Sequence, residues 1–434
     1  MKGFQDEVEL LDGSMVLGDL INKHIYDRTC AEKSPFFVAD LGEIVKQHIR
    51  WRAKMKQIRP FYSVKSNSSP VVLDVLAALG TGFVCSNKKE VDLVKGFGVQ
   101  SHDIILAGAC KQLSHIKHAA KHHITLLVCD NEVEMRKIAR FHPKANLLLW
   151  LRPGHCCEET LLPFGSSLKN CRHLMKSAAE LGLRVTGVKF SVPSCCQHRQ
   201  SFSHAVAEAR CVFDMGEEHG FKMNILDIGD SFDGSEAQMD EVNAELKPML
   251  DMYFPLSAGL SIIAEPGAYY VSSAFTLAIN IIDKKNLALD LSGQSQRSCH
   301  IDNSEGQGTA VICQDDLTLH PLFIPPTPSF KHLVIRLPGS LSEVSPEEPL
   351  FSSCLWGPSE DNLDQIVDRC LLPELSVGDW LIFRNAGASI QGSLFINGEQ
   401  RKPAVFYCIT PCDWKEILNC GITLDVGMKN VSLL

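Results

Sequence analysis

Short apolar runs recur along the first two thirds of the chain, and segments with helical periodicity separate them. Two of these segments, residues 71–80 and 204–220, end in a glycine, which is typical of a helix C-terminus. Strand–helix alternation repeated eight times predicts a parallel barrel surrounded by helices over residues 34–266. The eight apolar runs cover residues 61–65, 82–85, 104–108, 126–130, 147–152, 185–190, 225–229 and 262–266.

Beyond residue 266 the pattern changes to β-rich runs that polar or proline-rich breaks separate. The runs cover residues 269–280, 332–336, 349–355, 379–383 and 403–410. Such a pattern without regular helices predicts a mostly antiparallel sheet. The expected fold is therefore α/β, with a (β/α)8 barrel over residues 34–266 and a β-rich domain made of residues 1–33 and 267–434.

Composition narrows the class of protein. The chain has 434 residues, 45% of them hydrophobic and 21% charged, as in ordinary globular proteins. A net charge of −9 argues against a nucleic-acid partner, because phosphate contacts need a basic face. No run approaches the roughly 18 apolar residues of a membrane span, and the N-terminus lacks the apolar core of a signal peptide. These observations predict a cytoplasmic protein without membrane contact.

The 17 cysteines are scattered and lack metal-ligand spacing, so we expect free thiols in a reducing compartment and no metal site.

Barrel enzymes carry their reacting groups at the C-terminal ends of the strands, where this sequence offers Lys65 and Glu265. Lys65 could form a Schiff base with an aldehyde cofactor, or could be a solvated surface lysine. Glu265 could pair with a pyridinium nitrogen, or could cap the following loop. The spacing of the residues leaves these alternatives open.

Several motifs resemble those of eukaryotic ornithine decarboxylase and the antizyme inhibitors, which belong to the group IV pyridoxal-phosphate decarboxylases. They include PFYSVKSNS, IIAEPGAYYV and LPELSVGDWLIF, and the resemblance extends over nearly the whole chain. It implies an alanine-racemase-like barrel with a C-terminal β domain, pyridoxal phosphate as cofactor and a head-to-tail homodimer in the enzymes. It further implies that Lys65 is the Schiff-base lysine and Glu265 the partner of the pyridine nitrogen. Asp316 and Asp361 correspond to the carboxylates that hold the distal amine of ornithine.

The chain departs from this family where the cofactor phosphate would be held. Asp230 and Ser231 stand in LDIGDSF where the enzymes have the glycines of LDIGGGF; Ala268 replaces their phosphate-binding arginine, and Ser389 their tyrosine. A carboxylate about 4 Å from a phosphate opposes binding by roughly 4 kcal/mol at an effective dielectric near 20. Each lost charge-assisted contact is worth about 1.5–3 kcal/mol. The sequence therefore predicts that pyridoxal phosphate is bound weakly or not at all.

Other departures surround the expected substrate. Glu360 replaces the catalytic cysteine, and the others are Ser191 for the stacking histidine, Trp150 for an arginine, Val84 for an acidic residue and Gln307 for a tyrosine. The retained Lys65, Glu265 and Asp361 lack a phosphate site, so we predict a catalytically inactive protein. The alternatives are a pyridoxal-phosphate-dependent decarboxylase of ornithine or of another amino acid, and a protein that has lost both decarboxylation and partner binding.

Residues 111–144 carry seven Lys and Arg against three Asp and Glu, a charge of +4 on an acidic chain. Taken alone, the pattern fits either a solvated pair of helices or a surface for an acidic partner. The resemblance assigns this segment to antizyme binding, through Lys111, Lys117, Lys121, Glu134 and Lys137. We therefore predict an antizyme-inhibitor-like regulator of polyamine biosynthesis and uptake that forms a weak homodimer or none.

Overall fold

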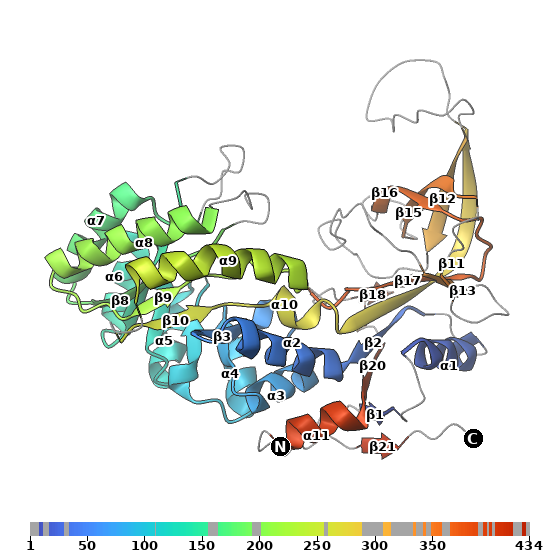
Figure 1. The fold of residues 1–434 in the computed structure, drawn as a ribbon, viewed down its shortest axis with the longest axis horizontal. Coiled ribbons are helices and arrows are strands. Elements are labelled where there is room, and N and C mark those ends of the chain that lie inside the picture. The colour runs from blue at the N-terminus through green and yellow to red at the C-terminus, as the bar shows by residue number, and fades with distance from the viewer. Residues whose placement is uncertain are drawn as a thin grey trace. The chain divides into compact units, whose positions relative to one another are not determined.

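The computed structural model describes residues 8–11, 17–29, 34–108, 110–154, 164–192, 201–255, 259–288, 307–313, 333–335, 342–343, 349–357, 365–388, 394–396, 399–401, 404–419 and 428–430. Contacts divide the chain into two compact units, which Figure 1 shows in ribbon form. One unit comprises Glu43–Val271 and Lys415–Asp425. The other comprises Met1–Gly42, Ser272–Trp414 and Val426–Leu434.

The first unit is a closed barrel of eight parallel strands, which confirms the predicted fold class. Every strand overlaps one of the predicted apolar runs, although β3 begins three residues before its run. Strand β10 closes the barrel on β3, with Ile262 opposite Ile58. The strands are β3 (Ile58–Ser63), β4 (Gly82–Cys85), β5 (Ile104–Leu106), β6 (Leu126–Cys129), β7 (Asn146–Leu151), β8 (Arg184–Phe190), β9 (Ile225–Asp227) and β10 (Ser261–Ala264).

Helices follow the barrel strands, and local capping chemistry fixes where several of them begin. The Asn87 side chain accepts hydrogen bonds from the amides of Lys89 and Glu90, so α4 starts at Lys88. Asn131 and Ser167 cap α6 and α7 in the same way. The helices are α2 (Leu41–Lys54), α3 (Pro70–Ala78), α4 (Lys88–Gly96), α5 (Leu113–Lys121), α6 (Glu132–Phe141), α7 (Leu168–Glu180), α8 (Ser201–Glu218), α9 (Glu236–Tyr253) and α10 (Ala268–Val271), with 3-10 turns η1 (Val64–Ser66) and η2 (Ser101–Asp103).

Six apolar side chains from six strands form one buried cluster, which only the interior of the barrel can bring together. Burial of such side chains stabilises the barrel by roughly 1.5–3 kcal/mol each. The cluster consists of Phe61, Val84, Ile105, Val128, Leu148 and Ile263. Val84 is thus part of the packed interior beneath the strand ends.

The second unit is built on an open sheet in the order β14-β13-β17-β11-β2-β20-β1-β21, with β12, β15 and β16 attached through β11. With the separate hairpin of β18 and β19 included, seven of the eleven strand pairings in the described residues are antiparallel, which agrees with the predicted mostly antiparallel sheet. The four parallel pairings join β20 to β1, β20 to β2, β1 to β21, and β12 to β15. The strands are β1 (Val8–Leu10), β2 (Phe36–Asp40), β11 (Phe275–Ala288), β12 (Gln307–Cys313), β13 (Leu333–Ile335), β14 (Ser342–Glu343), β15 (Phe351–Trp356), β16 (Gln365–Leu372), β17 (Trp380–Phe383), β18 (Leu394–Ile396), β19 (Glu399–Arg401), β20 (Ala404–Ile409) and β21 (Met428–Asn430). The unit also contains α1 (Leu17–Thr29), while α11 (Pro411–Asn419) spans the boundary at Trp414.

The start of the barrel unit differs from the boundary drawn from the sequence at residue 34. Strand β2 lies in the open sheet, antiparallel to β11 with Phe37 opposite Leu277, and parallel to β20. Contacts place the boundary after Gly42. The described part of the chain contains no helix with the length and apolarity that crossing a bilayer requires.

A substitution at Gly187 tests the close contact between β8 and β9 that helps to close the barrel. It lies in β8 opposite Ile225 of β9, and a Cβ atom there would come closer to the Ile225 carbonyl oxygen than real Cβ contacts allow. Gly187→Ala should lower the free energy of unfolding by about 1–3 kcal/mol, measured by urea denaturation. The matched control is Gly96→Ala in α4, which meets open space and should be neutral or stabilising by up to about 1 kcal/mol. Equal stability of the two variants would contradict this account of the strand contact.

Candidate functional site

The structure brings Lys65 and Asp230 together at the C-terminal ends of the barrel strands. Lys65 lies in the 3-10 turn η1 directly after β3, and Asp230 follows β9. Lys65 Nζ lies 3.6 Å from Asp230 Oδ2, and the two side chains are 59% and 40% exposed. The carboxylate expected where the enzymes have a glycine is therefore the ion-pair partner of the lysine expected to form the Schiff base.

Glu265 has a different cationic partner, Lys189 of β8. Lys189 Nζ donates a hydrogen bond to Glu265 Oε2, and both side chains are buried, at 6% and 4% exposure. A buried carboxylate is stable in its ionised form only with a partner of opposite charge. In this chain the partner is a lysine of the barrel itself.

A third charged group, Asp227 at the end of β9, completes this buried cluster. Burial and repulsion by the Glu265 carboxylate raise the pKa of Asp227 well above its usual value. Asp227 Oδ2 and Glu265 Oε1 find no hydrogen-bond donor among the described residues, and a proton on Asp227 would supply a donor between the two carboxyl groups.

The charge of Lys189 is stabilised by its surroundings. Burial alone would lower the pKa of Lys189, but attraction by Glu265, Asp227 and Asp230 outweighs that effect and raises it. The ammonium group also lies 5.3 Å from the centroid of the Trp150 ring, within the range of a cation–π contact. Trp150, which the sequence places at the position of an arginine, thus contacts a cation of the protein.

The loop after β9, where the sequence resemblance places phosphate binding, forms hydrogen bonds within the protein. Gly229, at φ 79°, donates its amide to Asp227 Oδ1 at 2.9 Å, and the Phe232 amide donates to the Asp230 carbonyl at 2.8 Å. The buried Ser231 hydroxyl donates to the carbonyl of Val192 and accepts from its amide. Each of these bonds ties the loop to itself or to the end of β8.

The remaining residues expected at the cofactor site either flank the strand ends or are not described. Ser191 follows β8 and lies against Gly229, whereas Ala268 is the half-buried first residue of α10. Gln307 begins β12, but its side chain is outside the described residues. Outside them altogether lie Asp316, Glu360, Asp361 and Ser389.

These observations decide whether the described residues fit pyridoxal phosphate. The cofactor needs positive charge or free amides around its phosphate, a free lysine, and a carboxylate available to its ring nitrogen. Here Asp230 pairs with Lys65, Lys189 pairs with Glu265, and Ala268 offers only a methyl group. The described part of the site does not fit the cofactor.

Two of the five residues expected to bind antizyme form a buried pair. Lys111 Nζ lies 3.0 Å from Glu134 Oε2, and the side chains are 0% and 2% exposed. Lys111 also donates to the carbonyls of Gly108 and Val128, and its own amide donates to Glu134 Oε1 at 2.7 Å. These contacts fix the loop between β5 and α5 onto α6.

The other three expected residues are at least partly accessible. Lys137 is 31% exposed and donates to the Lys111 carbonyl at 2.9 Å, whereas Lys117 and Lys121 on α5 are exposed. The Lys117 ammonium lies 4.8 Å from the centroid of the Phe141 ring on α6. The five residues thus separate into a supporting group of Lys111, Glu134 and Lys137 and an exposed pair, Lys117 and Lys121.

Lys189 is the functional residue that sequence reasoning missed. It stands in an apolar strand, within KFSVPSCC, where the enzymes' SFHVGSGC has a serine. A charged residue inside a predicted barrel strand is the signal that could have revealed it, because buried lysines are rare unless they are paired.

Comparisons with known proteins agree with this architecture. A family model described as "Pyridoxal-dependent decarboxylase, pyridoxal binding domain" matches residues 41–272. Antizyme inhibitor 1 of Rattus norvegicus is 47% identical to the chain over 437 residues, which cover 99% of this chain and 96% of that protein. Ornithine decarboxylase of Rattus norvegicus is 40% identical over 439 residues, or 99% of this chain and 93% of that protein.

Among solved structures, the arginine decarboxylase of Paramecium bursaria Chlorella virus matches with a TM-score of 0.76 at 22% identity. The match covers 90% of this chain and 100% of the viral one, and it supports the fold. The two mammalian relatives and the family model also show to which family the chain belongs. The chain belongs to the family of pyridoxal-dependent decarboxylases that includes the ornithine decarboxylases and the antizyme inhibitors.

Proposed function

We propose that this protein is a catalytically inactive member of its family that binds antizyme and so regulates polyamine biosynthesis and uptake. The observation that carries the first half of the proposal is the buried ion pair of Lys189 and Glu265. The carboxylate that would pair with a cofactor ring nitrogen is satisfied by the protein. Removing one partner of such a pair typically costs about 3–5 kcal/mol, so the arrangement resists displacement by a ligand.

The entrance of the barrel supports the same conclusion. Lys65 can act as a nucleophile only if its amine is free, and here its Nζ lies in an ion pair 3.6 Å from Asp230 Oδ2. The same carboxylate repels a phosphate. A single substitution in the loop after β9 therefore acts against both the phosphate and the aldehyde end of pyridoxal phosphate.

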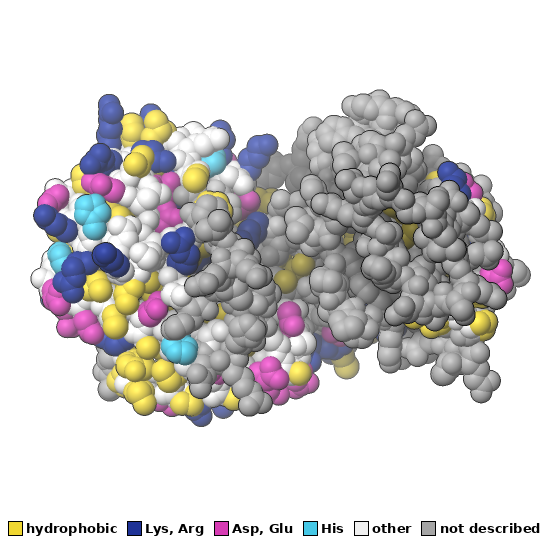
Figure 2. Space-filling view, turned by 90° about the horizontal axis from the view of Figure 1, so that it is seen from above, with side chains coloured by type: hydrophobic (Ala, Val, Ile, Leu, Met, Phe, Trp, Pro, Cys, Tyr) yellow, Lys and Arg dark blue, Asp and Glu magenta, His cyan; other side chains and the backbone are white. Residues whose placement is uncertain are grey.

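The second half of the proposal rests on α5 and α6. With the Lys111–Glu134 pair buried, the exposed or part-exposed cations of residues 111–144 are Lys117, Lys121, Arg136, Lys137, Arg140 and Lys144. Exposed cations raise the rate of encounter with an acidic partner and define its orientation. On the face of the barrel unit that Figure 2 shows, basic and acidic side chains are interspersed.

An inactive protein that binds antizyme would compete with ornithine decarboxylase for it and release the active enzyme. The rat antizyme inhibitor 1, 47% identical to this chain, carries that role in its name. A cytoplasmic location and weak or absent homodimerisation, both expected from the sequence, stay predictions.

Addition of pyridoxal phosphate tests the inactive site. The full-length protein should develop no saturable visible absorbance, and its spectrum should equal that of Lys65→Ala. Amine release from ornithine, lysine, arginine and leucine should stay at the level of that variant. The alternative function, a decarboxylase with another substrate, predicts a saturable signal that Lys65→Ala abolishes. Observing that signal would refute the inactive-site proposal and leave the antizyme proposal standing.

Charge reversal tests the antizyme surface. Lys117→Glu combined with Lys121→Glu should slow association with antizyme by at least about tenfold at low salt, with a smaller effect as ionic strength rises. The matched control, Lys222→Glu with Lys247→Glu, reverses two exposed lysines elsewhere on the barrel unit and should change binding little. Both measurements are made by surface plasmon resonance with a metal chelator present. Equal rates for the two double variants would place the antizyme contact elsewhere.

A stability measurement distinguishes the residues of this segment that support the fold from the exposed residues proposed to contact antizyme. Lys111→Met removes the buried cation of Glu134 and leaves only the partly exposed Lys137, whose Nζ lies 3.4 Å from Glu134 Oε1. The variant should lower the free energy of unfolding by up to about 3–5 kcal/mol. The variant with Lys117→Glu and Lys121→Glu should unfold close to wild type, because both side chains are exposed. Urea denaturation checks both values. A Lys111→Met variant as stable as wild type would contradict the supporting role.

The proton on Asp227 in the buried cluster predicts a pH dependence. Asp227 has a raised pKa in the folded protein, so the unfolded chain releases this proton first as pH rises. Stability therefore falls above about pH 4, by up to roughly 1.4 kcal/mol per pH unit, until the folded group also ionises. Asp227→Asn should remove that part of the decline, whereas Asp251→Asn, at an exposed position on α9, should not. Identical pH profiles of unfolding for the three proteins would exclude a proton on Asp227.

A further inference from the structure

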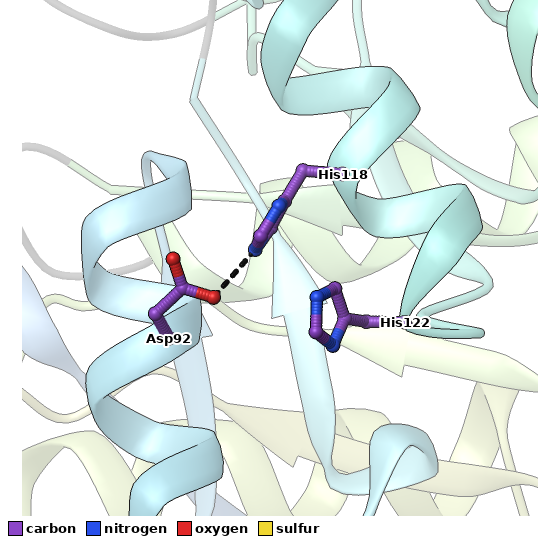
Figure 3. Close-up of side chains that lie close together, drawn as sticks. All are labelled: Asp92, His118 and His122. Carbon is purple, nitrogen blue, oxygen red and sulfur yellow. Dashed lines mark hydrogen bonds and ion pairs between the residues drawn. The ribbon is translucent and has the colours of Figure 1, made fainter.

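Asp92, His118 and His122 form a cluster of metal-ligating side chains on the outer helices of the barrel (Figure 3). One ligand atom from each of the three residues lies within 4.8 Å of the others. Asp92 comes from α4, His118 from α5, and His122 directly follows α5. The cluster lies apart from the strand-end residues described above and has no part in the proposed function.

The local backbone explains why the two histidines share a face. They are four residues apart, and the His122 amide donates to the His118 carbonyl at 3.0 Å, which continues the helical turn. Their ring centroids lie 4.3 Å apart. Figure 3 shows Asp92 directed from the neighbouring helix towards the same space, with a hydrogen bond of 2.7 Å between Asp92 Oδ1 and His118 Nε2.

We propose that these three side chains bind a zinc ion, with the fourth position of the tetrahedron open to water. Zinc is bound at about 2.0–2.2 Å by histidine nitrogen and carboxylate oxygen, which places neighbouring ligand atoms about 3.4 Å apart. The Asp92–His118 separation of 2.7 Å is shorter than that value, and the three ligand atoms all lie within 4.8 Å of one another. The Asp92 side chain is 56% exposed and that of His118 18%, so small rotations suffice to bring the ligands to the metal.

The ligand set also selects the class of metal. Two imidazoles suit zinc and similar transition metals, whereas magnesium and calcium prefer sites made entirely of oxygen ligands. Two lysines near the cluster, Lys95 and Lys121, reduce its affinity for a metal cation without blocking the site. The Lys95 ammonium donates to the Val99 carbonyl and the Ser101 hydroxyl, and the exposed Lys121 side chain precedes His122 in the chain.

Metal binding here would have a structural consequence. A zinc ion would link α4 to α5, the helix that also carries the exposed Lys117 and Lys121. The proposal does not depend on antizyme, and its test contains none. Its failure would therefore leave the proposed function untouched.

The test measures zinc affinity of the reduced full-length protein by competition with a chromophoric chelator. Each of three variants should bind one equivalent of zinc more than about tenfold more weakly than wild type. They are His118→Ala, His122→Ala and Asp92→Asn. The control is His173→Ala on α7, which removes a histidine that is 61% exposed and should leave affinity unchanged. Magnesium in large excess should not compete.

Cobalt substitution distinguishes this cluster from the 17 cysteines of the chain. The difference spectrum between wild type and His122→Ala should show ligand-field bands without thiolate charge transfer. Identical zinc titrations of wild type and the three cluster variants would overturn the proposal and leave only a hydrogen bond between His118 and Asp92. A thiolate band in the difference spectrum would overturn it as well, because the metal would then lie on cysteine.

Discussion

The buried ion pair of Lys189 and Glu265 is the central electrostatic interaction at the C-terminal ends of the barrel strands. Both side chains are almost completely buried, and an ionised group at that depth requires a partner of opposite charge. Burial and repulsion by the Glu265 carboxylate raise the pKa of the neighbouring Asp227, and attraction by Lys189 opposes that shift without cancelling it. The Trp150 ring then lies beside the ammonium group. One lysine in β8 thus pairs with the Glu265 carboxylate and contacts a neighbouring aromatic side chain.

The same physical rule acts at Lys111 and Glu134, with a different outcome. There the buried pair fixes a loop on α6, and the contacts of Lys111 with the carbonyls of Gly108 and Val128 leave its ammonium group no access to solvent. Similarity to the family at these two positions is therefore explained by packing. The electrostatic character of the surface comes from exposed cations such as Lys117 and Lys121.

The sequence predicted the barrel because parallel strands buried on both faces appear as apolar runs, and all eight runs became strands. It did not place β2 correctly in space, since the pairing of Phe37 with Leu277 links residues 240 positions apart and leaves no local signal.

Candidate residues Lys65 and Glu265 were found through their strand-end positions. Their partners were not, because the proximity of Asp230 to Lys65 and of Lys189 to Glu265 arises only when the barrel closes. The His118–Asp92 contact was missed for the same reason, since it joins two helices.

Among the described residues at the barrel entrance, the charges of the two lysines are matched without a ligand. Lys65 is matched by Asp230 and Lys189 by Glu265, while Ala268 contributes no charge where the enzymes have an arginine. A site designed for an anionic cofactor would carry surplus positive charge until the cofactor arrived. Asp230, in the loop after β9, removes that surplus and pairs with Lys65, the lysine that pyridoxal phosphate would otherwise engage. Retention of Lys65 is therefore compatible with loss of catalysis, because the residue has acquired a partner within the protein.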